Sequence, residues 1–290
     1  MTSQQPGDNP GTIDRDDVRR GPTSWAGGAT HVGSKSSPNQ DALAIAATSS
    51  STHRSAIVAV SDGVSTSPHS DVASQLAVDR ATDTLISMLT DHDHHDQPGD
   101  LAEAMRRAVL VANESIVEAA GDDTDGYACT LVLALVHKDL VVVANMGDSR
   151  AYWFGDDGTN LMLTTDDSMA QLSIELGVTR DVAEASSQAH AITKWLGPNA
   201  PDLQPQLGGF RVAGPGWLLV CSDGLWNYAS SPEDLRAIWD ELPQPGELTA
   251  EAMASELIDW ANGRGGHDNI TVGLVRAEPA AVAAPAEKAG

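Results

Sequence analysis

The 290-residue sequence predicts an α+β fold in which sheets are stacked between layers of helices. Several apolar runs are continuous and rich in β-branched residues, which is the composition of strands covered on both faces. These runs are grouped before and after pairs of helical segments, so sheets and helices should form separate layers. Because only 4% of the residues are aromatic, the core must be built from Ala, Val, Leu and Ile, which suits such a fold.

The first predicted elements are a β-hairpin and two long helices. Residues 42–47 and 55–61 are short apolar runs flanked by polar turn residues, which is typical of paired strands. Apolar residues then recur at helical spacing over residues 71–90 and again over residues 101–120. Two amphipathic helices should therefore follow the hairpin.

Three apolar runs in the middle of the chain should form a meander in one buried sheet, and they span residues 129–136, 140–146 and 151–154. The second half of the chain predicts a mostly polar helical region, a strand, two helices and a closing strand. In that order, these elements are expected at residues 169–187, 217–221, 232–242, 248–262 and 270–275.

One folded domain is expected over residues 23–277. This range has no internal repeat and no shift of composition that would mark a linker. Residues 1–22 are rich in Gly, Pro, Asp and Arg without periodicity, and residues 278–290 are rich in Ala, Pro and Glu. Both ends should therefore be disordered tails.

The charge of the chain limits what it can bind. The sequence has 17 basic and 41 acidic residues, which gives a formal net charge of −24. Such a charge repels nucleic acid and anionic membrane surfaces, so neither is an expected partner. The N-terminus has no apolar segment, and no apolar stretch approaches the ~20 residues of a membrane span, which predicts a cytoplasmic protein. Cys129 and Cys221 lie inside apolar runs and should be buried free thiols.

Three predicted strands end in an aspartate: Asp62 in AIVAVSDG, Asp148 in VVVANMGDS and Asp223 in WLLVCSDG. A strand end is where a rigid scaffold projects a carboxylate into a cleft. Asp41 enters the first strand and Asp268 precedes the last strand, which makes a set of five. Carboxylates that converge from distant strand ends are ligands that Mg2+ and Mn2+ accept. Taken alone, each of these residues is more typical of a turn former or a helix cap.

Eight short sequence motifs, which follow one another along the chain, change that interpretation. They are SPNQDA, VSDGV, CTLVLA, MGDSRAY, LTTDDS, ITKWLG, LLVCSDGLW and DNITV. Together they resemble the metal-dependent protein phosphatase family, type two C (the PPM family), in its bacterial serine/threonine-specific form. The resemblance covers nearly the whole of residues 24–276. It implies a four-layer α-β-β-α sandwich with two central antiparallel sheets and a metal channel at one end of them.

The resemblance also implies a set of cation ligands. Asp62 would bridge two Mn2+ or Mg2+ ions, and Asp223 and Asp268 would bind the first ion. Asp41 and the carbonyl of Gly63 would bind the second ion. Asp148 matches the position of a third, weaker metal site, assisted by Asp223.

The expected activity is hydrolysis of phosphoserine and phosphothreonine on proteins, in opposition to a serine/threonine kinase. Two cations about 3.5–4 Å apart lower the pKa of a bridging water, which would attack the phosphate without a phosphoenzyme intermediate. Asp62, Asp223 and Asp268 are the predicted catalytic residues. The protein is expected to act as a monomer.

The sequence departs from the family pattern at two places. Ser36 stands where the family usually has an arginine that grips the substrate phosphate, and only the neighbouring Lys35 could supply a charge. The loop after Gly63 reads GVSTSPHSD and lacks the usual glycines. His69 in this loop is a candidate for the general acid, although an exposed loop histidine is the plainer interpretation.

These departures keep other functions open. One alternative is a weakly active or non-catalytic regulatory module with the same fold. Others are a phosphatase dedicated to one regulatory protein, or one that acts on a small phosphorylated molecule. The intact set of aspartates favours catalysis. Three further expectations concern a variable flap at residues 169–187, a structural role for Arg150, and an Asn269 that orients Asp268.

Overall fold

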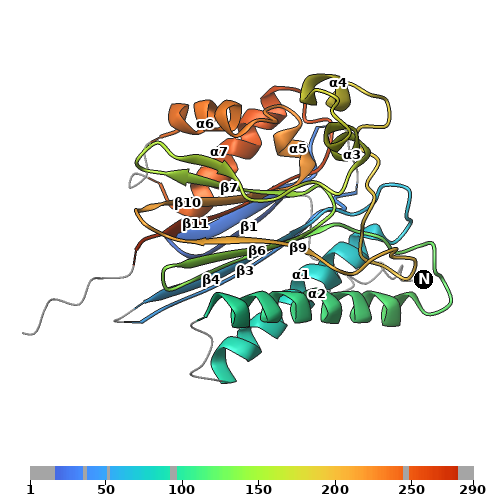
Figure 1. The fold of residues 1–290 in the computed structure, drawn as a ribbon, viewed down its shortest axis with the longest axis horizontal. Helices are drawn as coiled ribbons and strands as arrows, with labels where there is room; N and C mark the ends of the chain where they lie inside the picture. Colours follow the sequence, from blue (N-terminus) through green and yellow to red (C-terminus); the bar gives the residue numbers. More distant parts are fainter. Residues whose placement is uncertain (1–16, 35–37, 51–52, 92–96, 244–247, 280–290) are drawn as a thin grey trace, which may run out of the picture.

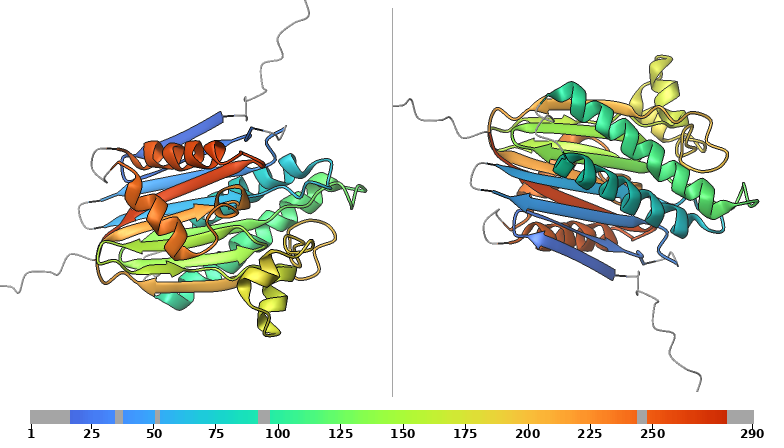
Figure 2. Two further views of the ribbon diagram at one scale, coloured as in Figure 1. Left: turned by 90° about the horizontal axis from the view of Figure 1, so that it is seen from above. Right: turned by 90° about the horizontal axis from the view of Figure 1, so that it is seen from below.

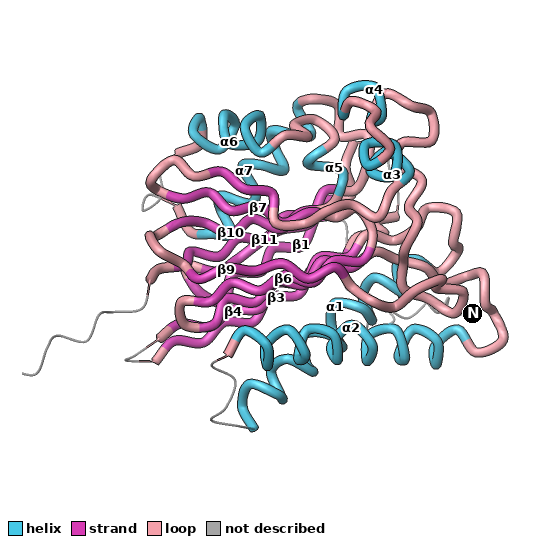
Figure 3. The backbone as a smooth tube through the Cα atoms, in the orientation of Figure 1, coloured by secondary structure: helices cyan, strands magenta, loops and turns pink. Residues whose placement is uncertain are grey.

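Two antiparallel sheets lie face to face in the computed structural model, which describes residues 17–34, 38–50, 53–91, 97–243 and 248–279. Figure 1 shows one helical layer outside each sheet, so the order of the layers is helix, sheet, sheet, helix. Figure 3 shows the same separation, with the strands gathered between two layers of helices. The predicted α+β sandwich is confirmed.

The two sheets contain six and five strands. The strands of the first sheet are β1 (Asp17–Thr23), β2 (Ala26–His31), β7 (Arg150–Gly155), β8 (Asn160–Met162), β10 (Gly216–Cys221) and β11 (Ile270–Ala277). Their spatial order is β1-β2-β11-β10-β7-β8. The strands of the second sheet are β3 (Ala42–Ser49), β4 (Arg54–Ser61), β5 (Leu131–His137), β6 (Leu140–Met146) and β9 (Gln206–Arg211). Their spatial order is β3-β4-β5-β6-β9.

The helices divide between the two outer faces and one end of the sandwich. Their bounds are α1 (Ser70–Asp91), α2 (Pro98–Ala120), α3 (Met169–Glu175), α4 (Arg180–Glu184), α5 (Asp223–Trp226), α6 (Pro232–Glu241) and α7 (Ala250–Gly263). The two views of Figure 2 show α6 and α7 over the six-stranded sheet and α1 and α2 over the five-stranded sheet. In Figure 1, α3 and α4 lie at the end of the sandwich, beside α5.

The core has three layers because side chains alternate along the central strands. Along β5, Leu131 and Leu133 pack with α1 and α2, whereas Val132 and Ala134 lie between the sheets. β10 alternates in the same way between α7 and the interface of the sheets. A strand buried on both faces needs apolar residues at every position, which explains the continuous apolar runs of the sequence.

Local capping explains where several helices begin. The hydroxyl oxygens of Ser168, Ser231 and Thr249 each accept a hydrogen bond from the main-chain nitrogen three residues later, at the starts of α3, α6 and α7. These bonds satisfy main-chain donors that have no partner inside the helix. Pro232 at the first position of α6 adds a backbone angle suited to a helix.

The predicted meander over residues 129–154 is wrong in its last strand. β5 and β6 pair in the five-stranded sheet, whereas β7 pairs with β10 in the other sheet. The chain crosses between the sheets at Gly147, which has a φ of 105° and lies where a Cβ would be 2.6 Å from Thr130 Cγ2. Only glycine combines that backbone conformation with so close an approach.

The predicted N-terminal tail is also too long. Residues 17–22 belong to β1, which pairs with β2 at the edge of the six-stranded sheet. An edge strand has one free side and needs little apolar sequence, so its composition resembles that of a tail. Residues 1–16 and 280–290 lie outside the described residues. The polar helical region at 169–187 is two short helices, α3 and α4, interrupted by Gly177 with a φ of 94°.

The structure also bears on the expectations about the cysteines and about membrane-spanning segments. Cys129 and Cys221 are both free and buried, as predicted. In the described part of the chain, no helix is both long enough and apolar enough to cross a membrane.

Candidate metal centre

The five predicted aspartates lie at one end of the sandwich. Asp62 follows β4, Asp148 follows β6 and Asp223 follows β10, while Asp41 precedes β3 and Asp268 precedes β11. Since neighbouring strands are antiparallel, the end of one strand meets the start of the next. Ala42 at the start of β3 is paired with Ser61, for example. Strand register therefore brings Asp41 close to Asp62 in one sheet and Asp223 close to Asp268 in the other, and the face-to-face packing of the two sheets brings these pairs together.

The carboxylates are close enough to disfavour one another's charge. Burial raises the pKa of Asp41 to about 7 and that of Asp223 to about 6, with further increases from neighbouring carboxylates. Burial also raises the pKa of Asp62, and the charges of Asp41, Asp223, Asp148 and Asp268 raise it further. The pKa of Asp148 is raised by burial and then by Asp223. Without a counter-charge, this end of the protein resists full ionisation.

Asp41 is held by two hydroxyl groups, one from Ser222 directly after β10 and one from Thr271 in β11. Its Oδ2 accepts hydrogen bonds from Ser222 Oγ at 2.7 Å and from Thr271 Oγ1 at 2.6 Å. Its Oδ1 is buried and has no hydrogen-bond partner among the described residues, and the same is true of Asp223 Oδ1. Orphaned buried oxygens are costly unless something else satisfies them. A set of carboxylate oxygens with raised pKa values and orphaned atoms fits a hard divalent cation.

Gly63 and Asn269 bring the loops of the site into contact. A Cβ on Gly63 would lie 2.7 Å from the carbonyl oxygen of Gln40, so only glycine allows this approach. Asn269 Oδ1 accepts a hydrogen bond from Gln40 N at 2.7 Å, and its Nδ2 donates to Val32 O at 2.8 Å. Asn269 thus fixes the segment beside Asp268 to the segment that carries Asp41, which supports the positioning role expected for it.

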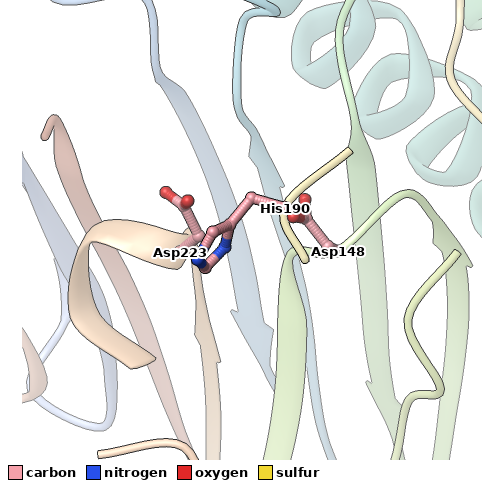
Figure 4. Close-up of side chains that lie close together, drawn as sticks. All are labelled: Asp148, His190 and Asp223. Atoms are coloured by element: carbon pink, nitrogen blue, oxygen red, sulfur yellow. The ribbon is translucent and has the colours of Figure 1, made fainter. Parts of the chain in front are cut away.

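The structure places a histidine, His190, beside two of the five aspartates, and the sequence did not indicate this residue. His190 lies in the segment after α4, and ligand atoms of Asp148, His190 and Asp223 are all within 4.8 Å of one another. Figure 4 shows these three side chains together, carried by three separate segments. The sequence around His190, SSQAHAIT, is a polar loop with no metal-ligand spacing, so only the tertiary structure could find it.

His69 lies in different surroundings. Its Nε2 is 3.8 Å from Asp123 Oδ2, its ring centroid is 5.0 Å from that of Tyr127, and its side chain is half exposed. Within the part of the chain that the structure describes, no hydrogen bond or ion pair joins it to the five aspartates. These contacts agree with the plainer interpretation of an exposed loop histidine. Lys35 and Ser36 lie outside the described residues.

Arg150 is a buried structural cation beside the site. It is 1% exposed, and its guanidinium donates to both carboxylate oxygens of Asp166, from Nε to Oδ1 at 2.9 Å and from Nη2 to Oδ2 at 2.7 Å. The guanidinium also lies 3.6 Å from the ring centroid of Trp226, and Nη1 donates to Ser230 O at 3.0 Å. Trp226 Nε1 in turn donates to Asp148 O at 2.9 Å. Arg150 thus holds Trp226 in place, and Trp226 supports the segment that carries Asp148.

Replacing Arg150 by Met should destabilise the protein by about 3–5 kcal/mol, because Asp166 would remain buried without its partner. Urea unfolding in the presence of a chelator measures this change. The double variant Arg150→Met/Asp166→Leu should recover most of the loss. Arg276→Met breaks a more exposed pair with Asp156 and should cost about 1 kcal/mol or less. Equal losses from Arg150→Met and Arg276→Met would contradict the assigned role of Arg150.

Comparison with known proteins agrees with this architecture. A family model described as protein phosphatase 2C matches residues 28–261. A putative protein phosphatase 2C-type of Streptococcus pyogenes is 33% identical over 159 residues, which are 54% of this chain and 61% of that protein. The serine/threonine phosphatase stp of Listeria welshimeri is 31% identical over 226 residues, which are 76% of this chain and 83% of that protein.

A solved structure with the same fold is that of the catalytic domain of the serine/threonine protein phosphatase PstP in complex with two manganese ions. It is 25% identical to this chain, and the superposition covers 86% of this chain and 96% of that one with a TM-score of 0.61.

Proposed function

This chain belongs to the protein phosphatase 2C family, and on that premise we propose that it hydrolyses phosphoserine and phosphothreonine on proteins with the help of divalent cations. The observation that carries the proposal is the convergence of five aspartates at one end of the sandwich, with orphaned buried oxygens on Asp41 and Asp223. The named activities of the relatives support the same conclusion. Its substrates would be the products of a serine/threonine kinase.

The proposed ligands are those that the family pattern assigns. Two Mn2+ or Mg2+ ions would be held by Asp41, Asp62, Gly63, Asp223 and Asp268, with Asp148 at a third, weaker site. When bound, such ions lower the pKa of a ligated water and neutralise charge on a phosphoryl group. The crystallised PstP catalytic domain with two manganese ions supports Mn2+ as a suitable cofactor.

The chain's own residues hold and separate the charges of this centre. Ser222 and Thr271 fix the carboxylate of Asp41 from one side, which leaves its second oxygen available. Thr130 Oγ1 accepts from Asp62 N at 2.9 Å, and Thr130 N donates to Asp62 O at 2.8 Å, so the main chain at Asp62 is fixed too. Preorganised ligands need little rearrangement when charge develops on a substrate.

Neither cysteine is suited to act as a nucleophile. Burial raises the pKa of Cys129 to about 12, and burial also raises the pKa of Cys221. A thiol must ionise to attack, and a buried one with a raised pKa does not do so near neutral pH. This supports hydrolysis by water over a route through a phosphorylated cysteine.

Phosphate release from an aryl phosphate and from a phosphothreonine peptide tests the proposal, with Mn2+, Mg2+ or a chelator present. We expect release from both substrates with Mn2+ and none with the chelator. Release from the aryl phosphate alone would favour a small-molecule phosphatase. No release from either substrate would favour a regulatory module with the phosphatase fold.

Asp148→Ala should lower the turnover number but leave the tight cation sites intact, because a third, weaker site tunes the rate without holding the other two ions. Calorimetric titration with Mn2+ should show the tight class of sites at wild-type affinity. Loss of that class in Asp148→Ala would contradict the assignment of Asp148 to a separate site.

A further inference from the structure

We propose that His190 is a protein ligand of the third cation site, together with Asp148 and Asp223, and that its imidazole makes this site prefer Co2+, Ni2+ or Zn2+ to Mg2+. The proposal rests on the proposed function, since it adds a ligand to the weakest of the three sites named there. It assigns a binding role to a residue in the segment that follows the flap helices α3 and α4.

The geometry of the three side chains is close to that of a ligand set. Their ligand atoms lie within 4.8 Å of one another. Two atoms that each lie about 2.1 Å from one ion are at most about 4.2 Å apart, so a small side-chain rotation closes the set. His190 is exposed, so its side chain has room for this rotation, whereas Asp148 is buried. Figure 4 shows the three side chains close together.

The main chain on both sides of His190 is fixed to the start of α3. Ala170 N donates to Ala189 O at 3.3 Å, and Met169 N donates to Ala191 O at 2.9 Å. Ala189 is itself buried. Since the residues before and after His190 are held by these bonds, its side chain leaves the main chain at a fixed place beside the carboxylates. This is what preorganisation of a ligand requires.

His190 and Asp148 also share one aromatic support. The indole of Trp226 donates a hydrogen bond to the main chain of Asp148 at 2.9 Å, and its ring centroid lies 6.0 Å from that of His190. Asp148 and His190 also border the same small cavity, of about 10 Å³, with Trp226. A displacement of Trp226 would therefore move both ligands of the proposed site.

Contacts of Glu184 also hold the flap helix α4 against the rest of the domain. Glu184 in α4 accepts hydrogen bonds from Ser230 Oγ and from Arg180 Nη1, both at 2.8 Å, and lies 3.5 Å from the buried Arg150. The flap thus meets the same cation–aromatic stack that supports Asp148. The segment that carries His190 is anchored beside the cluster even without an ion.

The imidazole nitrogens of His190 are available to bind a metal. Among the residues that the structure describes, none forms a hydrogen bond with the ring of His190, and a ring nitrogen lies within 4.8 Å of a carboxylate oxygen of Asp148 and of Asp223. A ring nitrogen is a ligand that Co2+, Ni2+ and Zn2+ accept readily, whereas Mg2+ favours oxygen ligands and water. The other proposed sites of this chain offer only oxygen, so His190 is the feature that would distinguish the third one.

Calorimetric titration of the full chain with Co2+ and, separately, with Mg2+ tests the assignment without substrate. His190→Ala should weaken the low-affinity class of Co2+ sites at least about tenfold, because loss of even an indirect partner of a metal typically costs about 10–100-fold. The Mg2+ titration should be unchanged. The visible absorption of bound Co2+ should also change, since its intensity depends on the ligands.

Two variants serve as controls. His69→Ala removes another exposed histidine, whose contacts are with Asp123 and Tyr127, and should titrate like the wild type. His190→Gln keeps a polar side chain and should behave like His190→Ala. A wild-type Co2+ isotherm for His190→Ala, or an equal loss for Co2+ and Mg2+, would overturn the proposal. Absence of phosphate release by the wild type would instead contradict the proposed function, so the two failures are distinguishable.

Discussion

Asp62→Asn is expected to reduce phosphate release to less than about a tenth of the wild-type rate at saturating Mn2+, while the fold remains intact. Asp62 is the proposed bridge between two cations, so its loss removes a ligand from both. An amide cannot supply the negative charge, although it preserves the size of the side chain. Steady-state release from a phosphothreonine peptide measures the effect.

The same substitution should stabilise the metal-free protein. Burial raises the pKa of Asp62, and four neighbouring carboxylates raise it further, so its ionised form is unfavourable in the folded chain at neutral pH. Replacing it with a neutral residue removes that penalty, which should raise the midpoint of thermal unfolding in chelator. Asp259→Asn, on an exposed face of α7, serves as the control and should change neither activity nor stability. A fully active Asp62→Asn variant would refute the two-cation assignment.

The stability of the metal-free protein is expected to fall as the pH rises from about 4 to 7. Asp41 has a pKa of about 7 and Asp223 of about 6, both raised chiefly by burial. In the unfolded chain the same carboxyls titrate near 4, so over this interval the folded state binds more protons. Stability must then decrease with pH, by about 1.4 kcal/mol per pH unit for each extra proton bound, and level off above the folded pKa.

Urea unfolding at pH 5, 6, 7 and 8 measures this dependence, once with chelator and once with Mn2+. Divalent cations bind carboxylates in their ionised form, so the stabilisation that Mn2+ gives should increase over the same range. Asp41→Asn should flatten the chelator profile, because it removes the group with the pKa of about 7. A chelator profile that rises with pH would show that these carboxyls do not titrate as the structure indicates.

Most of the elements could be predicted from sequence because their patterns are local. The runs at residues 140–146 and 217–221 needed only a strand buried on both faces, and they form β6 and β10 with nearly these bounds. β2 and β9 were missed because their sequences, AGGATH and QLGGFR, each contain two glycines and have no strong strand signal. Their pairing partners, and not their composition, make them strands.

The candidate carboxylates could be selected from the sequence by their positions at strand ends and by the resemblance to the phosphatase family. Asp62 and Asp223 each occupy a strand end followed by glycine, although they follow strands of different sheets and meet only because the sheets pack face to face. The sequence thus indicated the candidate aspartates, and the packing of the two sheets brought them together. It also indicated that Arg150 is structural, although its partner Asp166 and its contact with Trp226 came from the structure.

Only the tertiary structure decided which sheet receives β7 and which histidine approaches the aspartates. The first depends on the positive φ of Gly147 and on the packing of β7 against β10. The second depends on main-chain hydrogen bonds between the start of α3 and the residues on either side of His190. Such contacts join segments far apart in the chain, and no local pattern of apolar or charged residues encodes them. Local sequence therefore indicated most of the elements and the candidate carboxylates, whereas long-range packing placed His190 beside them.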